Sequence, residues 1–163
     1  MIESVFETIL REYSGLVSRI VRTFEANAAA RDDLRQEVTL ALWRAAPSWR
    51  GDCTLRTFVA RVTHNVCVSH VRQAIRQPKH SDLSVTLQSH DEGLEESASR
   101  ADMNRRLTAA VASLPKGLRE VAILMLEGFS VAEIAQTLGI NEGAVYTRSN
   151  RAKAALRELM VKE

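Results

Sequence analysis

The sequence has little of what marks secreted, membrane-bound or disulfide-rich proteins. Only two cysteines, Cys53 and Cys67, occur among its 163 residues, so no disulfide framework is expected and a reducing cytoplasm is the predicted compartment. No apolar run has membrane-spanning length, and the start MIESVFETILREY lacks the basic-then-apolar layout of an export signal. The net charge is only +2, so any affinity for nucleic acid depends on where the charges lie.

The sequence also lacks the residue arrangements that carry catalysis. No nucleophile and base pair, phosphate-binding glycine loop or carboxylate cluster is recognisable, so we expect no enzyme, no cofactor and no small-molecule substrate. The run His64-x-x-Cys67-x-x-His70 has metal-binding residue types. On a helix of about 3.6 residues per turn its ends diverge by roughly 240 degrees, so no metal site is expected there. A redox pair of Cys53 and Cys67 is not expected either.

Apolar residues recur every three or four positions in the first half of the chain, which predicts amphipathic helices. The first helix is expected from Ile2 to Phe24. The second is expected to begin with Asp32 or Asp33 as its N-cap, and the third to begin after Thr54. No alternating strand pattern of useful length interrupts them, so this half is predicted to be an all-α bundle.

Helical periodicity is lost between residues 77 and 101, where serine, glycine and acidic residues gather. Such a composition predicts a solvated, flexible linker. Periodicity then resumes towards the C-terminus. The sequence therefore predicts an all-α protein of two small helical domains, 1–76 and 102–163, joined by the acidic segment 77–101.

The stretch FSVAEIAQTLGINEGAVYTRSNRAKAALREL has the capping and turn residues expected of two helices joined by a tight turn. Ser130 and Glu133 form a capping box, Gly139 suits a left-handed turn, and Asn141 is expected to cap the second helix. That helix is expected to run from about residue 142 to 161 and to bury four apolar side chains, Val145, Ala152, Leu156 and Leu159. This pattern is typical of a helix-turn-helix.

The second helix of a helix-turn-helix enters the major groove of DNA, where side chains near its N-terminus meet base edges. The residues expected to face DNA are Ala144, Tyr146, Thr147, Arg148, Asn150 and Arg151. Arg148 and Arg151 suit either guanine edges or phosphates, and the sequence leaves both open. The alternative to DNA contact is a purely structural helical hairpin.

Basic residues dominate the stretch from Arg44 to Lys79, where Asp52 is the single acid. Three aromatic residues, Trp43, Trp49 and Phe58, lie beside or within it. Basic side chains follow a phosphate backbone and aromatic rings stack on unpaired bases, so the combination favours melted or single-stranded nucleic acid. Trp43 and Phe58 are predicted to be core residues, whereas Trp49 lies in a loop and is more available for function.

Two stretches together resemble one known family. DDLRQEVTLALWRAAPSWRGDCTLRTFVARVTHNVCVSHVRQ resembles region 2 of bacterial RNA polymerase sigma factors of the extracytoplasmic-function type. LPKGLREVAILMLEGFSVAEIAQTLGINEGAVYTRSNRAKAALREL resembles their region 4. Both stand in the family's order with a short linker between them. The resemblance implies an alternative sigma factor with core RNA polymerase, through the β′ clamp helices and the β flap, and promoter DNA as partners.

The resemblance also implies roles for individual residues. Those implied in docking on the β′ clamp helices are Asp33, Leu34, Gln36 and Glu37. Those implied near the melted minus 10 strand are Trp49, Arg50, Arg56, Asn65, His70 and Arg72. The second helix of the helix-turn-helix is implied to read the minus 35 element. Family members are commonly held inactive by an anti-sigma factor, which is therefore a further expected partner.

Two other interpretations fit parts of the sequence. A free-standing helix-turn-helix regulator would bind duplex DNA without polymerase, usually as a dimer on matched half-sites. An adaptor with sigma-like surfaces would sequester another protein and have no promoter function. The intact basic and aromatic segment in the first half argues against the adaptor.

Overall fold

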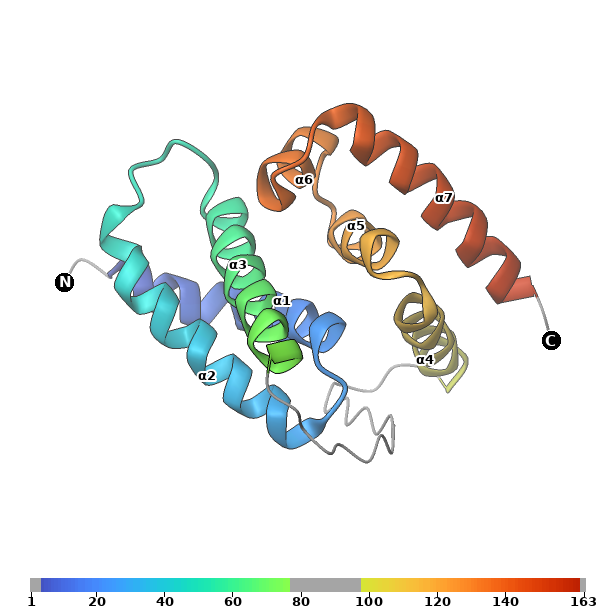
Figure 1. The fold of residues 1–163 in the computed structure, drawn as a ribbon, viewed down its shortest axis with the longest axis horizontal. Helices are drawn as coiled ribbons and strands as arrows, with labels where there is room; N and C mark the ends of the chain where they lie inside the picture. Colours follow the sequence, from blue (N-terminus) through green and yellow to red (C-terminus); the bar gives the residue numbers. More distant parts are fainter. Residues whose placement is uncertain (1–3, 77–97, 162–163) are drawn as a thin grey trace. The chain divides into compact units, whose positions relative to one another are not determined.

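The computed structural model describes residues 4–76 and 98–161 and shows only helical elements in this part of the chain. In chain order they are α1 (Val5–Phe24), α2 (Ala28–Ala45), the short 3-10 helix η1 (Ala46–Ser48), α3 (Leu55–Arg76), α4 (Ala98–Ser113), α5 (Lys116–Leu126), α6 (Val131–Leu138) and α7 (Glu142–Val161) (Figure 1). The chain divides into two compact units. The predicted all-α class is confirmed.

The predicted linker falls mainly outside the described residues. Its last four positions, 98–101, belong to α4, and the exact domain boundaries stay a prediction. None of the helices that the structure describes combines the length and the apolar character needed to cross a membrane.

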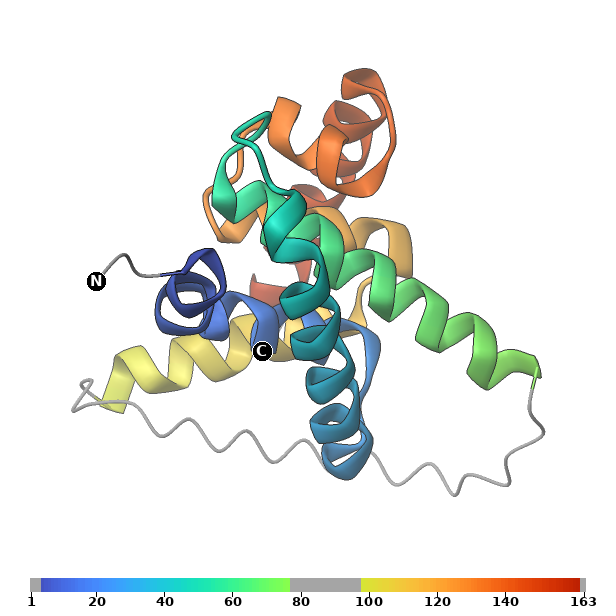
Figure 2. The same ribbon diagram turned by 90° about the vertical axis from the view of Figure 1, so that its left-hand side faces the viewer.

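The first unit is a bundle in which α1, α2 and α3 each pack against the other two (Figures 1 and 2). Its core includes Ile9, Val21, Leu34, Val38 and Val59, whose side chains are at most 1% exposed. Removing an aliphatic side chain of this size from water contributes roughly 1.5–3 kcal/mol. The bundle therefore holds α2 and α3 firmly enough to present side chains on their outer faces.

Side-chain caps fix where the first two helices begin. Ser4 and Glu7 form a reciprocal capping box at the start of α1. The amide oxygen of Asn27 accepts a hydrogen bond from the backbone nitrogen of Ala30 at 3.0 Å, so α2 begins at Ala28. The predicted start at Asp32 or Asp33 was wrong by about a turn, because the alanines after the cap favour a helix without adding an apolar stripe.

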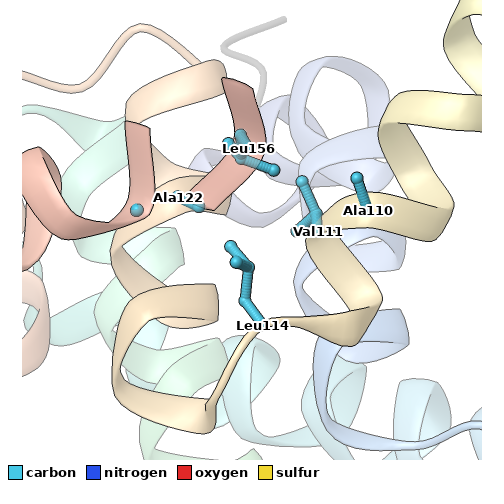
Figure 3. Close-up of a cluster of buried hydrophobic side chains, with 6 residues drawn as sticks. Ala110, Val111, Leu114, Ala122 and Leu156 are labelled. Atoms are coloured by element: carbon cyan, nitrogen blue, oxygen red, sulfur yellow. The ribbon is translucent and has the colours of Figure 1, made fainter. Parts of the chain in front are cut away.

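The second unit packs α4, α5 and α7 around an apolar cluster. Figure 3 shows Ala110 and Val111 of α4, Leu114 just beyond it, Ala122 of α5 and Leu156 of α7. Ala152 completes the set on α7. The prediction that Leu159 is buried was wrong, since 42% of this residue is exposed near the end of the helix.

The local signals of the helix-turn-helix are confirmed. Ser130 and Glu133 exchange capping hydrogen bonds at the start of α6, of 3.1 and 3.3 Å. Gly139 has a φ of 69°, a left-handed conformation that L-residues with a side chain adopt at a cost. Asn141 Oδ1 accepts a hydrogen bond from the backbone nitrogen of Ala144 at 2.8 Å and so caps α7.

Candidate nucleic-acid interface

One side of α7 is buried, and this burial fixes which of its side chains are exposed. Val145 and Ala152 are fully buried, and Ser149 Oγ lies 3.2 Å from Met125 Sδ on α5. The predicted DNA-facing residues have different exposures: Tyr146, Thr147, Asn150 and Arg151 are exposed, whereas Ala144 and Arg148 are half-buried. The structure therefore gathers these six residues on or beside the accessible side of one helix.

The loop between η1 and α3 is closed by Trp49. Its indole Nε1 donates a hydrogen bond to the Cys53 carbonyl at 3.0 Å, and its side chain is half-buried. Gly51 has a φ of 83°, which allows the reversal inside this loop. Arg50 is exposed at the start of the turn. An aromatic ring and a cation are thus held in a short, internally bonded loop.

The start of α3 is fixed as the sequence predicts. Thr54 Oγ1 accepts a hydrogen bond from the backbone nitrogen of Thr57 at 3.2 Å. Phe58 is buried, which confirms its expected place in the core. Of the other candidates on α3, Asn65 and Arg72 are exposed and Arg56 is half-buried.

His70 already has a protein partner. Its Nε2 lies 3.3 Å from Oε2 of Glu25, the residue that ends α1, and both side chains are 24% exposed. The other carboxylate oxygen of Glu25 accepts a hydrogen bond from the backbone nitrogen of Asn27 at 3.1 Å. The pair ties α3 to the turn between α1 and α2, which favours a structural role for His70.

The outer face of α2 carries the predicted polymerase-docking residues. Asp33, Gln36 and Glu37 are exposed. Leu34 is 0% exposed, so its side chain belongs to the bundle core and cannot itself contact a partner, contrary to the implied docking role. The helix turns its opposite side to the core, because burial of Leu34 and Val38 fixes its rotation.

Two apolar residues continue this face of α2. Leu40 is 46% exposed and Trp43 58% exposed. The prediction that Trp43 is a core residue was therefore wrong, because the helix buries Leu34, Val38 and Leu42 instead. At about 100 degrees per residue, Leu40 and Trp43 fall on the same side as Asp33 and Gln36. We define Asp33, Gln36, Glu37, Leu40 and Trp43 as the α2 face.

The two cysteines are free thiols, with Cys53 half-buried and Cys67 buried. Burial raises the pKa of the Cys67 thiol from 9.0 to about 12, and the nearby negative charge of Glu37 adds to the effect. Among the described residues, no three His, Cys, Asp or Glu side chains are grouped so that they could hold a metal ion.

Comparison with known proteins matches both units to one family. Residues 9–77 match the family model of sigma-70 region 2, and residues 104–156 that of sigma-70 region 4. The ECF RNA polymerase sigma factor SigD of Mycobacterium tuberculosis (strain ATCC 25618 / H37Rv) is 31% identical over 144 residues, which cover 86% of this chain and 68% of SigD. SigM, an ECF RNA polymerase sigma factor of the same strain, is 26% identical over 162 residues, covering 95% of this chain and 76% of SigM. The chain belongs to the extracytoplasmic-function sigma factors.

Two solved structures share the fold of this sigma factor. The sigma factor RpoE from Bartonella quintana, crystallised with the anti-sigma factor NepR, gives a TM-score of 0.75 at 20% identity, covering 97% of this chain and 98% of RpoE. CnrH, solved in complex with the cytosolic domain of CnrY, gives a TM-score of 0.64 at 24% identity, covering 95% and 86%. The family works with RNA polymerase and promoter DNA, and the resemblance found in the sequence is confirmed.

The sequence interpretation missed the apolar half of the α2 face in this sigma factor. The sequence does place Leu40 and Trp43 after Asp33 and Gln36 at helical spacing, which indicates a shared face. Leucine and tryptophan on a helix are most often core residues, so this spacing alone favours burial over an exposed apolar surface. Only the packing of α2 distinguishes the two assignments.

Proposed function

We propose that this chain is an alternative sigma factor that docks on core RNA polymerase through the α2 face, captures the melted minus 10 strand with the loop 49–53 and α3, and places α7 in the minus 35 major groove. The observation that carries the proposal is the match to regions 2 and 4, in that order, along one chain. Polymerase supplies the chemistry, and this chain supplies the choice of promoter.

The β′ clamp helices are the proposed partner of the α2 face. Asp33 and Glu37 offer carboxylates, and Gln36 an amide, to a basic coiled coil. Leu40 and Trp43 add exposed apolar area next to them, and tryptophan is enriched among the residues that dominate binding energy. A mixed polar and apolar strip of this kind suits a helical partner better than it suits solvent.

The minus 10 strand is the proposed ligand of the loop 49–53 and the outer side of α3. Unpaired bases leave the duplex at a cost of a few kcal/mol, which a protein recovers by stacking and hydrogen bonding. Arg50 and Arg72 are exposed cations that can follow the strand, and Trp49 is an aromatic ring held in the loop. Asn65 is the proposed base-edge contact, because its amide has both donor and acceptor groups.

The minus 35 element is the proposed ligand of α7, with the β flap as the partner of the same unit. The accessible side of α7 presents polar and basic side chains, while Val145 and Ala152 anchor the helix from behind. A helix held in this way fits the major groove, which is about 12 Å wide.

An anti-sigma factor is the proposed regulator. This proposal is supported by two structures of the same fold, Bartonella quintana RpoE in complex with the anti-sigma factor NepR and CnrH in complex with the cytosolic domain of CnrY. An inhibitor that covered the α2 face would prevent docking on polymerase. Transcription directed by this chain should then fall when the inhibitor is added and recover when excess chain is supplied.

Transcription in vitro tests the proposal. Purified chain and core polymerase are incubated with a promoter library, and start sites are mapped with and without the chain. Chain-dependent initiation from a shared minus 35 and minus 10 pattern is expected. Tight binding to duplex sites without any specific initiation would instead identify a free-standing regulator, and binding to neither DNA nor polymerase would identify an adaptor.

A further inference from the structure

The polar residues of α7 differ in how far their hydrogen-bonding groups are already engaged. Thr147 Oγ1 donates to the Gly143 carbonyl at 3.1 Å, so its hydroxyl proton is used within the helix. Asn150 is exposed, and its side chain makes no hydrogen bond to any residue between 4 and 76 or between 98 and 161. Its amide is therefore available to a ligand without breaking any bond inside the protein.

Helical rotation separates Asn150 from Arg148. The buried stripe of α7 runs through Val145, Ser149 and Ala152. Successive residues are about 100 degrees apart, so Asn150 points away from this stripe, whereas Arg148 borders it. Asn150 thus lies on the side of α7 that is turned away from the core, and Arg148 lies at the border of the buried stripe.

The guanidinium of Arg148 packs against α5 rather than along the outer side of α7. Its Cζ and Nη1 atoms lie 3.8 Å from the position that a β-carbon on Gly117 would take. Arg148 as a residue is half-buried, and Gly117 directly follows the exposed Lys116 along α5. Five N–H donors in a planar fork suit a phosphate.

We propose that Asn150 reads an adenine edge in the minus 35 groove and that the guanidinium of Arg148, which packs against Gly117, holds a backbone phosphate. This inference rests on the proposed function. An asparagine amide matches the N6 donor and N7 acceptor of adenine in a bidentate pair. A phosphate contact positions the protein without carrying sequence information. Asn150 is therefore a specificity-determining residue, and Arg148 a positioning residue.

Promoter libraries separate the two roles. Full-length chain with core polymerase is tested on templates randomised across the minus 35 element. Asn150→Ala should erase the preference for A·T at one base pair, where discrimination falls roughly 5- to 150-fold, and leave the other positions unchanged. Arg148→Ala should weaken all templates alike and lower the slope of log affinity against log salt by about 1. Asn104→Ala, on α4, is the control and should change neither.

Two further variants keep the test independent of folding. Arg148→Lys retains the charge and should retain the salt slope. Gly117→Asp places a carboxylate beside Arg148 and should weaken all templates alike, with a smaller effect in the Arg148→Ala background. Loss of preference at a single position in Arg148→Ala, or uniform weakening in Asn150→Ala, would overturn the assignment. Failure of the wild-type chain to initiate at any template would instead reject the proposed function.

Discussion

Burial divides the aromatic residues of the first unit into two kinds. Phe58 is 6% exposed and belongs to the core, whereas Trp43 is 58% exposed on the α2 face. Sequence alone assigned both to the core, because a large apolar residue at helical spacing usually is one. Contacts with other helices decide which side of a helix faces the core. The local sequence pattern carries no information about these contacts.

The two aromatic residues should respond differently to truncation. Phe58→Ala should lower the free energy of unfolding by about 3–5 kcal/mol, because it leaves a cavity. Trp43→Ala should change it by about 0.5 kcal/mol or less, as is usual for exposed sites, while weakening binding to core polymerase. Chemical denaturation and a core-binding titration measure the two quantities. A Trp43→Ala chain with full core affinity would remove Leu40 and Trp43 from the proposed docking face.

Cys67 should be inert until the chain unfolds. Burial raises the pKa of its thiol to about 12, so the reactive thiolate is scarce near neutral pH. In a Cys53→Ser chain at pH 8, a thiol reagent should react only after denaturant is added. Since the folded state holds this proton more tightly, the stabilising contribution is present below about pH 9 and is lost as pH rises towards 12. Rapid labelling of the native Cys53→Ser chain would contradict this assignment.

At the scale of elements, caps and turns were predictable because they depend on a few adjacent residues. The box of Ser130 and Glu133, the cap at Thr54 and the turn at Gly139 were all identified from spacing alone and are confirmed. The start of α2 was missed although Asn27 is a good cap, because no apolar periodicity follows it at once. The capping residue determines where a helix begins. Apolar periodicity reveals that start only when the apolar face of the helix begins at the same place.

The turn of the helix-turn-helix gives a matched pair of glycine substitutions. Gly139 has a φ of 69° with no atom near its missing β-carbon, so Gly139→Ala should cost roughly 1–2 kcal/mol from backbone conformation alone. Gly117 is the second residue of α5 and has ordinary contact distances, so Gly117→Ala should instead stabilise the fold by up to about 0.5–1 kcal/mol. Thermal unfolding of both variants measures the difference. Equal changes in the two variants would mean that the left-handed turn is not what Gly139 provides.

At the scale of the whole molecule, the proposed function assigns polymerase docking and the minus 10 strand to the first unit and the minus 35 element to the second. The family could be predicted from the sequence because both halves carry recognisable motifs in a fixed order. The residues of each surface could be predicted less well, since Leu34 proved buried and His70 paired with Glu25. Motifs identify a surface, and packing decides which of its members reach a partner.

Substitutions on the α2 face and on α7 should impair different binding steps. Glu37→Lys reverses a charge on the α2 face and should lower core-polymerase affinity at least about tenfold, equivalent to 1.4 kcal/mol. Glu12→Lys, an exposed reversal on α1, is the matched control and should leave core affinity unchanged. Arg148→Ala should weaken promoter binding and leave core affinity intact. Loss of core affinity in Arg148→Ala would contradict the division of roles.

The exposure of Trp43 also gives this protein an optical reporter. The chain has only two tryptophans, and the other, Trp49, is half-buried with its indole N–H bonded to a carbonyl. In a Trp49→Phe chain, all indole emission comes from the α2 face and should shift to shorter wavelength when a partner covers it. An indole analogue excited at longer wavelength would keep this signal distinct from the tryptophans of polymerase. Docking could then be followed in real time, before any DNA is added.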